Sequence, residues 1–234
     1  MKNSVLDLEF VADLSLPVGD IPRAWYIDPP NFEPVRLGDW VGSVAEGGAV
    51  NFFNVGFNPH GHGTHTETAG HILPERHSVH QHFKDYFTKA LVLTVVPSDS
   101  VISLEDFKAR WEAVAKSAVK SVIVRTEINP DGAATRAYSN TDWPYLDATI
   151  GTFLREQGVD HLLIDQPSVD QEEDGGALAC HRAFWGPQPE QSLYRTISEL
   201  LHIPRHVQDG HYLLNLQVAP LDNDAAPSRP LLYR

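Results

Sequence analysis

Three short apolar runs in the middle of the chain restrict the folds open to it. They occupy residues 90–96 (ALVLTVV), 121–125 (SVIVR) and 161–164 (HLLI). Each is rich in Val, Leu and Ile and lacks polar alternation, which is typical of strands buried on both faces of a sheet. We therefore expect a sheet that is covered on both sides.

Helical patterns separate these runs. Ser103 and Asp106 form the capping pattern of a helix start, and apolar residues then recur at helical spacing to residue 114. A second amphipathic helix fits residues 145–157, with Gly158 placed to take the left-handed conformation after its end. A third helix is predicted over residues 190–201. Strands that alternate with helices indicate an α/β fold.

The two ends of the chain are less regular. Residues 5–11 partly alternate and predict a strand, and the proline-rich passage 17–34 predicts an ordered loop. The last strand is expected over 212–218, followed by a tail broken by prolines. Without repeats or a linker, 234 residues fit one domain, 1–234.

Composition narrows the classes of function. The formal net charge of -13 disfavours nucleic acid as a partner, because the chain would repel phosphate backbones. No apolar stretch is long enough to span a membrane, so we expect a cytoplasmic protein. The only cysteine, Cys180, excludes an intrachain disulfide and any multi-cysteine metal cluster. We expect it to be a small buried apolar residue, so a metal would have to be held by His and carboxylates.

Such ligands are concentrated between residues 60 and 71. This segment, HGHGTHTETAGH, contains four histidines and Glu67, interleaved with glycines that allow tight turns. Imidazole and carboxylate are ligands that zinc and similar divalent metals accept. His65 and Glu67 would share one face of an extended strand. The alternative is a polar loop whose imidazoles bind backbone or water.

Other histidines and aromatic residues carry weaker signals. We expect six histidines outside this segment to be structural or solvated: His77, His80, His82, His202, His206 and His211. Four aromatic residues could line a pocket for a flat substrate but more often belong to a core: Trp25, Phe52, Phe53 and Trp185.

The segment resembles the HxGTHxDxPxH signature of the cyclase family of metal-dependent hydrolases, to which kynurenine formamidase and isatin hydrolase belong. The Gly-Thr-His core at 63–65 and the distal His71 match the signature. At three positions the chain differs: Gly61 occupies the place of the first histidine, Glu67 replaces Asp, and Ala69 replaces Pro.

The resemblance continues along most of the chain. Residues 13–15 (DLS) resemble the family's opening strand, and 164–170 (IDQPSVD) resemble its IDxPSVD motif. His181 is similar to a metal-binding histidine that opens a short helix, and Glu199 to a distal glutamate. Several motifs in the family's order are more specific than any one motif alone.

This resemblance implies roles for the matching residues. His65, Glu67, His181 and Glu199 would bind one or two divalent metals, Zn²⁺ or Mn²⁺. His71 would act as a general acid or base. His60 and His62 flank the missing ligand at Gly61, and a bulge at the neighbouring glycines would let either substitute; we favour His60.

The fold implied by the family is a single α/β domain with a mixed central sheet flanked by helices. The activity implied is hydrolysis of an amide, formamide or lactam-like C–N bond in a small molecule, by an arylformamidase-like homodimer or larger oligomer. One alternative is a lactone or ester hydrolase with the same site. Another is a non-catalytic metal- or ligand-binding protein that retains the fold. No GxSxG, GxxxxGK or GxGxxG motif supports serine-hydrolase or nucleotide chemistry.

Overall fold

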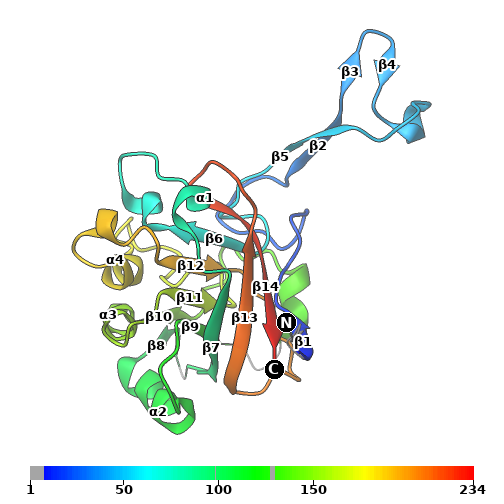
Figure 1. Ribbon diagram of the computed structural model, residues 1–234. Coiled ribbons are helices and arrows are strands. Elements are labelled where there is room, and N and C mark those ends of the chain that lie inside the picture. Colours follow the sequence, from blue (N-terminus) through cyan, green and yellow to red (C-terminus); the bar gives the residue numbers. More distant parts are fainter. Residues whose placement is uncertain (1–7, 98, 127–129) are drawn as a thin grey trace, which may run out of the picture.

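A mixed β-sheet that curls back on itself forms the centre of the computed structural model, which describes residues 8–97, 99–126 and 130–234 (Figure 1). The four strands β7, β9, β11 and β12 run parallel, and the other neighbours are antiparallel. In spatial order the strands are β1 (Phe10–Asp13), β14 (Ala225–Tyr233), β13 (Gly210–Val218), β7 (Phe87–Thr94), β9 (Ser121–Arg125), β11 (His161–Ile164), β12 (Thr196–Glu199) and β6 (His65–Thr68).

Strand β14 closes the sheet. Its first residues pair with β6 and its later residues with β13, so the two ends of the strand order meet. The result is an α/β domain with a closed, barrel-like mixed sheet. The predicted fold class, α/β with a mixed sheet, is confirmed. The sequence did not predict that the sheet closes into a barrel.

The central parallel strands face two cores. Leu91, Val122 and Leu162 point outward to α2 (Leu104–Val114), α3 (Ala148–Glu156) and α4 (Ala179–Trp185), which lie along one side of the sheet in Figure 1. The intervening Ile123 and Leu163 point into the barrel. Because both faces are buried, these strands are apolar at consecutive positions rather than at alternate ones.

The predicted elements in this central region are confirmed. β9 and β11 coincide with two of the apolar runs, and β7 (Phe87–Thr94) overlaps the third, which was expected over 90–96. Ser103 caps α2 by accepting a hydrogen bond from the Asp106 amide. Helix α3 is shorter than predicted, because Tyr145–Leu146 forms β10, which pairs with β8 (Val101–Ile102). Gly158 has a φ of 77° after the helix, as expected.

Two predictions for the second half of the chain were wrong. The helix expected over 190–201 is replaced by a short 3₁₀ turn, Pro189–Gln191, and strand β12. All four residues of β12 are buried between β11 and β6, where sheet pairing outweighs their helical spacing.

The proline-broken tail is in fact the nine-residue strand β14. Pro227 and Pro230 lack an N–H, but their carbonyls accept hydrogen bonds from the Ala219 and Leu14 amides at 2.9 Å each. They therefore take part in the sheet as acceptors.

The start of the chain also differs from expectation. Of the strand expected over 5–11, residues 5–7 lie outside the described part; within the described residues, β1 covers Phe10–Asp13. The passage 17–34 is irregular until Asn31–Pro34, which forms β2 and pairs with β5 (Phe53–Gly56). Together with β3 (Arg36–Leu37) and β4 (Trp40–Val41), these strands form an arm that extends away from the barrel (Figure 1).

A short helix, α1 (Val79–His82), covers the barrel near β6. Among the described residues, none of the helices has the length and apolarity needed to cross a membrane.

Candidate metal centre

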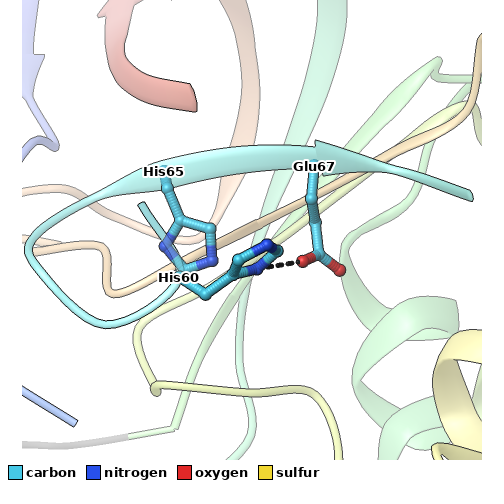
Figure 2. A group of neighbouring side chains, drawn as sticks. All are labelled: His60, His65 and Glu67. Carbon is cyan, nitrogen blue, oxygen red and sulfur yellow. Dashed lines mark ion pairs between the residues drawn. The ribbon is translucent and has the colours of Figure 1, made fainter. Parts of the chain in front are cut away.

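Strand β6 presents the central residues of the candidate site. His65 and Glu67 are two positions apart and project from the same face of the strand toward His60 (Figure 2). Both side chains are almost completely buried, at 0% and 1% exposure. His60 approaches from the preceding loop and places its Nδ1 2.9 Å from Glu67 Oε2.

The loop before β6 explains why His60, and not residue 61, faces this cluster. A Cβ atom on Gly61 would lie 2.4 Å from the Cδ1 atom of Ile27 and 3.2 Å from the Ala24 carbonyl oxygen. His62 faces elsewhere: its Nδ1 accepts a hydrogen bond from the Asn58 amide, and its Nε2 donates to the Asp28 carbonyl. Of the two alternatives for the missing ligand, the structure places His60 in the cluster.

Two further residues reach the cluster from distant segments. His181, at the start of α4, lies with its Nε2 3.0 Å from Glu67 Oε1 and 3.5 Å from Glu199 Oε1. Glu199, at the end of β12, has its Oε2 3.4 Å from His65 Nε2 and accepts a hydrogen bond from the Val169 amide. Glu199 thus lies in the cluster, as expected, although it is on a strand and not on the helix predicted over 190–201.

Asp170 holds His181 in place. Its Oδ2 lies 2.6 Å from His181 Nδ1, and its carboxylate also accepts hydrogen bonds from the Cys180 and His181 amides. This leaves the Nε2 atom of His181 facing Glu67. The sequence motif contained Asp170, but its role as the partner of His181 was not predicted from it.

The charges of the cluster shift several pKa values strongly. Burial lowers the pKa of His60, but hydrogen bonds to Asp224 and Glu67 outweigh this effect and raise it to about 10. For His181, the hydrogen bond to Asp170 and the close carboxylate of Glu67 likewise outweigh burial and raise the pKa well above its ordinary value. Burial raises the pKa of Glu67, but the charge of His71 and the close imidazoles of His181 and His60 hold it well below its usual range. The buried carboxylates thus favour positive charge between them.

Two buried atoms in the cluster have no hydrogen-bond partner in the described part of the chain: His65 Nε2 and Glu67 Oε1. The latter contacts His181 at 3.0 Å, but without hydrogen-bond geometry. Burying polar atoms without partners is costly. The donor set of imidazole and carboxylate therefore fits a divalent metal.

The ligand atoms fall into three groups, each with its atoms within 4.8 Å of one another. The first contains His60, His65 and Glu67, and the second contains Glu67, His181 and Glu199. Glu67 belongs to both, so its two oxygens could serve two neighbouring positions. The third group consists of His60, His71 and Asp224.

His71 lies beside the cluster on the short turn Ala69–Ile72 that follows β6. Its side chain is 29% exposed, and its ring centroid lies 4.3 Å from that of His60. Asp224, just before β14, was not predicted as a site residue. Only recognition of β14 as a strand could have indicated it, because the strand brings Asp224 beside β6.

A cavity of about 290 Å³ opens onto these residues. His60, Glu67, His71, His181 and Glu199 line it, together with Trp25, Asn58, Ser168 and Leu178. Trp25 thus lines the pocket, whereas Trp185 is buried in the core and Phe52 and Phe53 are exposed on the arm. A small molecule with one or two rings would fill this volume.

Comparison with known proteins identifies the family of the chain. A family model described as "Putative cyclase" matches residues 12–171. Kynurenine formamidase of Bacillus thuringiensis (strain Al Hakam) is 28% identical over 222 residues, which cover 94% of this chain and 95% of the relative. A shorter match, to kynurenine formamidase of Bacillus anthracis, is 34% identical over 90 residues, 38% of this chain and 39% of the relative.

Solved structures share the fold at lower identity. Isatin hydrolase A from Labrenzia aggregata bound to benzyl benzoate has a TM-score of 0.71 at 13% identity, covering 97% of this chain and 93% of that chain. A structure described as a potential metal-dependent hydrolase with cyclase activity has a TM-score of 0.70 at 15% identity, covering 97% and 98%.

Proposed function

The chain belongs to the cyclase family, and on that basis we propose that it is a metal-dependent hydrolase of a non-peptide C–N bond in a small molecule. The relatives named kynurenine formamidase, 28% identical along nearly the whole chain, support a formamide as the substrate class. Arylformamides such as N-formylkynurenine are the first substrates to test. The observation that carries the proposal is the pair of unpartnered buried atoms, His65 Nε2 and Glu67 Oε1, beside a cavity of suitable size.

In this proposal His60, His65, Glu67, His181 and Glu199 hold one or two Zn²⁺ or Mn²⁺ ions. When bound, a divalent cation supplies an acidic water at neutral pH and polarises a carbonyl oxygen. Glu67 belongs to two of the ligand groups, and it contacts His60 in one group and His181 in the other.

The chain's own residues supply proton transfer and substrate positioning. His71 lines the cavity and donates a proton to the leaving nitrogen, a role that suits an imidazole near neutral pH. Trp25 and Leu178 form an apolar wall against which a flat aryl group packs. The burial of the ligands keeps bulk water away from the reacting bond.

The variant His65→Ala tests the metal assignment. Removing this imidazole should abolish both stoichiometric Zn²⁺ or Mn²⁺ and arylformamide hydrolysis, because it takes a fully buried ligand from the group. His80→Ala, which removes an exposed histidine, is the matched control and should retain both. Metal content by elemental analysis and turnover after chelation and metal return are the measurements.

The same experiment addresses the alternatives. Untagged wild-type protein that binds no stoichiometric metal would contradict the hydrolase proposal and favour a binding protein. A matched pair of aryl formamide and aryl formate ester separates amide from ester hydrolysis. Turnover of the ester and not of the formamide would favour the lactone or ester hydrolase.

We also propose that residues 1–234 form one cyclase-type domain that assembles as a closed homo-oligomer in the cytoplasm. The exposed apolar residues of the arm, among them Phe32 and Phe52, support self-association. Cell fractionation tests the location, and light scattering tests the assembly.

A further inference from the structure

One carboxylate oxygen contacts two histidines of the site. Asp224 Oδ2 lies 2.9 Å from His60 Nε2 and 3.3 Å from His71 Nδ1. The Asp224 side chain is 22% exposed, and the two rings are tilted by 33° with their centroids 4.3 Å apart. Asp224 therefore lies outside both imidazoles, on the side of His60 opposite to Glu67.

The position of Asp224 fixes which ring atoms are left free. Because Nε2 of His60 faces Asp224, the Nδ1 atom points to Glu67 at 2.9 Å. Because Nδ1 of His71 faces the same oxygen, its Nε2 is the ring nitrogen left for other contacts. A carboxylate that accepts an N–H from an imidazole fixes both its tautomer and its orientation.

The same arrangement occurs at a second histidine of the site. Asp170 accepts from Nδ1 of His181 and leaves Nε2 toward Glu67. Two histidines that face different oxygens of Glu67 thus each have an aspartate on the other ring nitrogen. They differ in that His60 offers Nδ1 to the site, and His181 offers Nε2.

Asp224 also compensates for the position of its partner in the chain. His60 lies on the loop before β6 and is 20% exposed on its side chain, whereas His65 and His181 are buried at 0% and 2%. Packing alone fixes the ring of His60 less firmly than those of the other two. Asp224 lies next to β14, and its backbone carbonyl accepts a hydrogen bond from the Thr68 amide of β6. The hydrogen bond between its side chain and His60 supplies the missing restraint.

We propose that Asp224 is a positioning residue that holds His60 as a metal ligand and His71 as the proton-transfer group. The inference rests on the proposed function, since it assumes that His60 binds a metal. It predicts that the two histidines are coupled through one side chain. Loss of Asp224 should therefore weaken metal binding and slow proton transfer together.

The experiment compares Asp224→Ala and Asp224→Asn with Asp222→Ala in the full-length protein. Asp222, two residues away, is 69% exposed, and its carboxylate lies 3.7 Å from the exposed Arg76 guanidinium, so it is a matched control. Zn²⁺ affinity is measured by competition with a chromophoric chelator. We expect a loss of roughly 10- to 100-fold in Asp224→Ala, a smaller loss in Asp224→Asn, which keeps an acceptor oxygen, and no change in the control.

Two further readouts separate positioning from a general structural effect. In the NMR spectrum of the Zn²⁺-loaded wild type, the Nε2–H proton of His60 should be protected from exchange, and Asp224→Ala should remove that protection. With an arylformamide, the variant at saturating Zn²⁺ should lose kcat with little change in KM, and its kcat should depend differently on pH.

The outcomes are distinct. Wild-type protein that binds neither Zn²⁺ nor Mn²⁺ would overturn the proposed function and this inference together. Wild-type and Asp224→Ala proteins with equal Zn²⁺ affinity and equal His60 protection would overturn this inference alone and leave the hydrolase proposal standing. Unchanged far-UV circular dichroism and thermal midpoint show that the variant is folded.

Discussion

At the scale of single residues, the site is shaped by a glycine that stands where the family places a histidine. Gly61 lies against Ile27 and the Ala24 carbonyl, and its amide hydrogen-bonds the Asn58 carbonyl. A side chain at this position would have to displace the end of Ile27 and would crowd the Ala24 carbonyl oxygen, whereas His60 lines the cavity. One loop conformation therefore both packs Gly61 against Ile27 and turns His60, one residue earlier, toward Glu67.

This conformation makes Gly61→Ala a sharp test of the loop. The added Cβ would displace the terminal Cδ1 atom of Ile27, 2.4 Å away, and lie 3.2 Å from the Ala24 carbonyl oxygen, so we expect the free energy of unfolding in urea to fall by about 1 kcal/mol. Gly61→His should fail to add a ligand for the same reason. Combining Gly61→Ala with Ile27→Ala should recover part of the loss, since the Ile27 side chain is what the Cβ meets.

Gly19→Ala is the control for this comparison. Its Cβ would meet only the Ile21 carbonyl oxygen at an ordinary 3.8 Å, so stability should stay the same or rise slightly. A Gly61→Ala protein as stable as the control, or higher metal affinity in Gly61→His, would contradict this account of the loop.

The sequence could predict part of the site at this scale. His65 and Glu67 followed from spacing on a strand, and His181 and Glu199 from motif order; the structure brings all four together with His60. The choice between His60 and His62 depended on the contacts of Gly61, which a sequence does not contain. Asp224 carried no local signal, because only the pairing of β14 with β6 brings it near His60.

At the scale of elements, prediction succeeded where local pattern and tertiary environment agree. The strands β9 and β11 are apolar throughout because both of their faces are buried, and the Ser103 cap of α2 depends on local hydrogen bonds. It failed for β12 and β14, whose conformation depends on partners far away in the chain. Helical spacing and prolines were outweighed there by pairing with β6, β11 and β13.

Strand β11 begins with a buried histidine that should make stability depend on pH. His161 is 1% exposed, packs against Phe83 and bonds Thr196 through Nδ1, while its Nε2 has no hydrogen-bond partner within the described residues. Burial lowers its pKa from 6.5 to about 4, and the charges of Asp160 and Asp85 only partly oppose this.

The sign of the effect follows from proton binding. Between pH 6.5 and 4 the unfolded chain protonates this imidazole and the folded chain does not, so the free energy of unfolding falls as pH decreases. The contribution reaches about 3 kcal/mol near pH 4. We expect the stability difference between the metal-free wild type and His161→Asn to shrink by up to this amount from pH 7 to 4.5. Parallel pH profiles from urea denaturation of the two proteins would rule out this role for His161.

At the scale of the whole molecule, the barrel is closed but the arm is not covered. Pairing of β14 with β6 leaves the central ring of the sheet without an open edge there, which protects it from edge-to-edge association. The arm, in contrast, has exposed apolar residues along its length, including Phe32 at 48%, Leu37 at 68% and Phe52 at 57%. A two-stranded ribbon of this kind is only marginally stable in water without packing partners. We therefore propose that another copy of the chain packs against it.

Replacing the apolar residues of the arm should dissociate the oligomer. We expect wild-type protein to behave as a dimer or larger assembly in multi-angle light scattering, and Phe32→Ser combined with Phe52→Ser to shift it to monomer, because burying these two rings is what drives association. Phe87→Ser, which removes a ring that is 61% exposed on β7 outside the arm, should leave the assembly unchanged. The barrel core does not include the arm, so the double variant should keep its far-UV circular dichroism and bind Zn²⁺ as the wild type does. A monomeric wild type, or a double variant that remains associated, would show that the arm is not the surface of self-association.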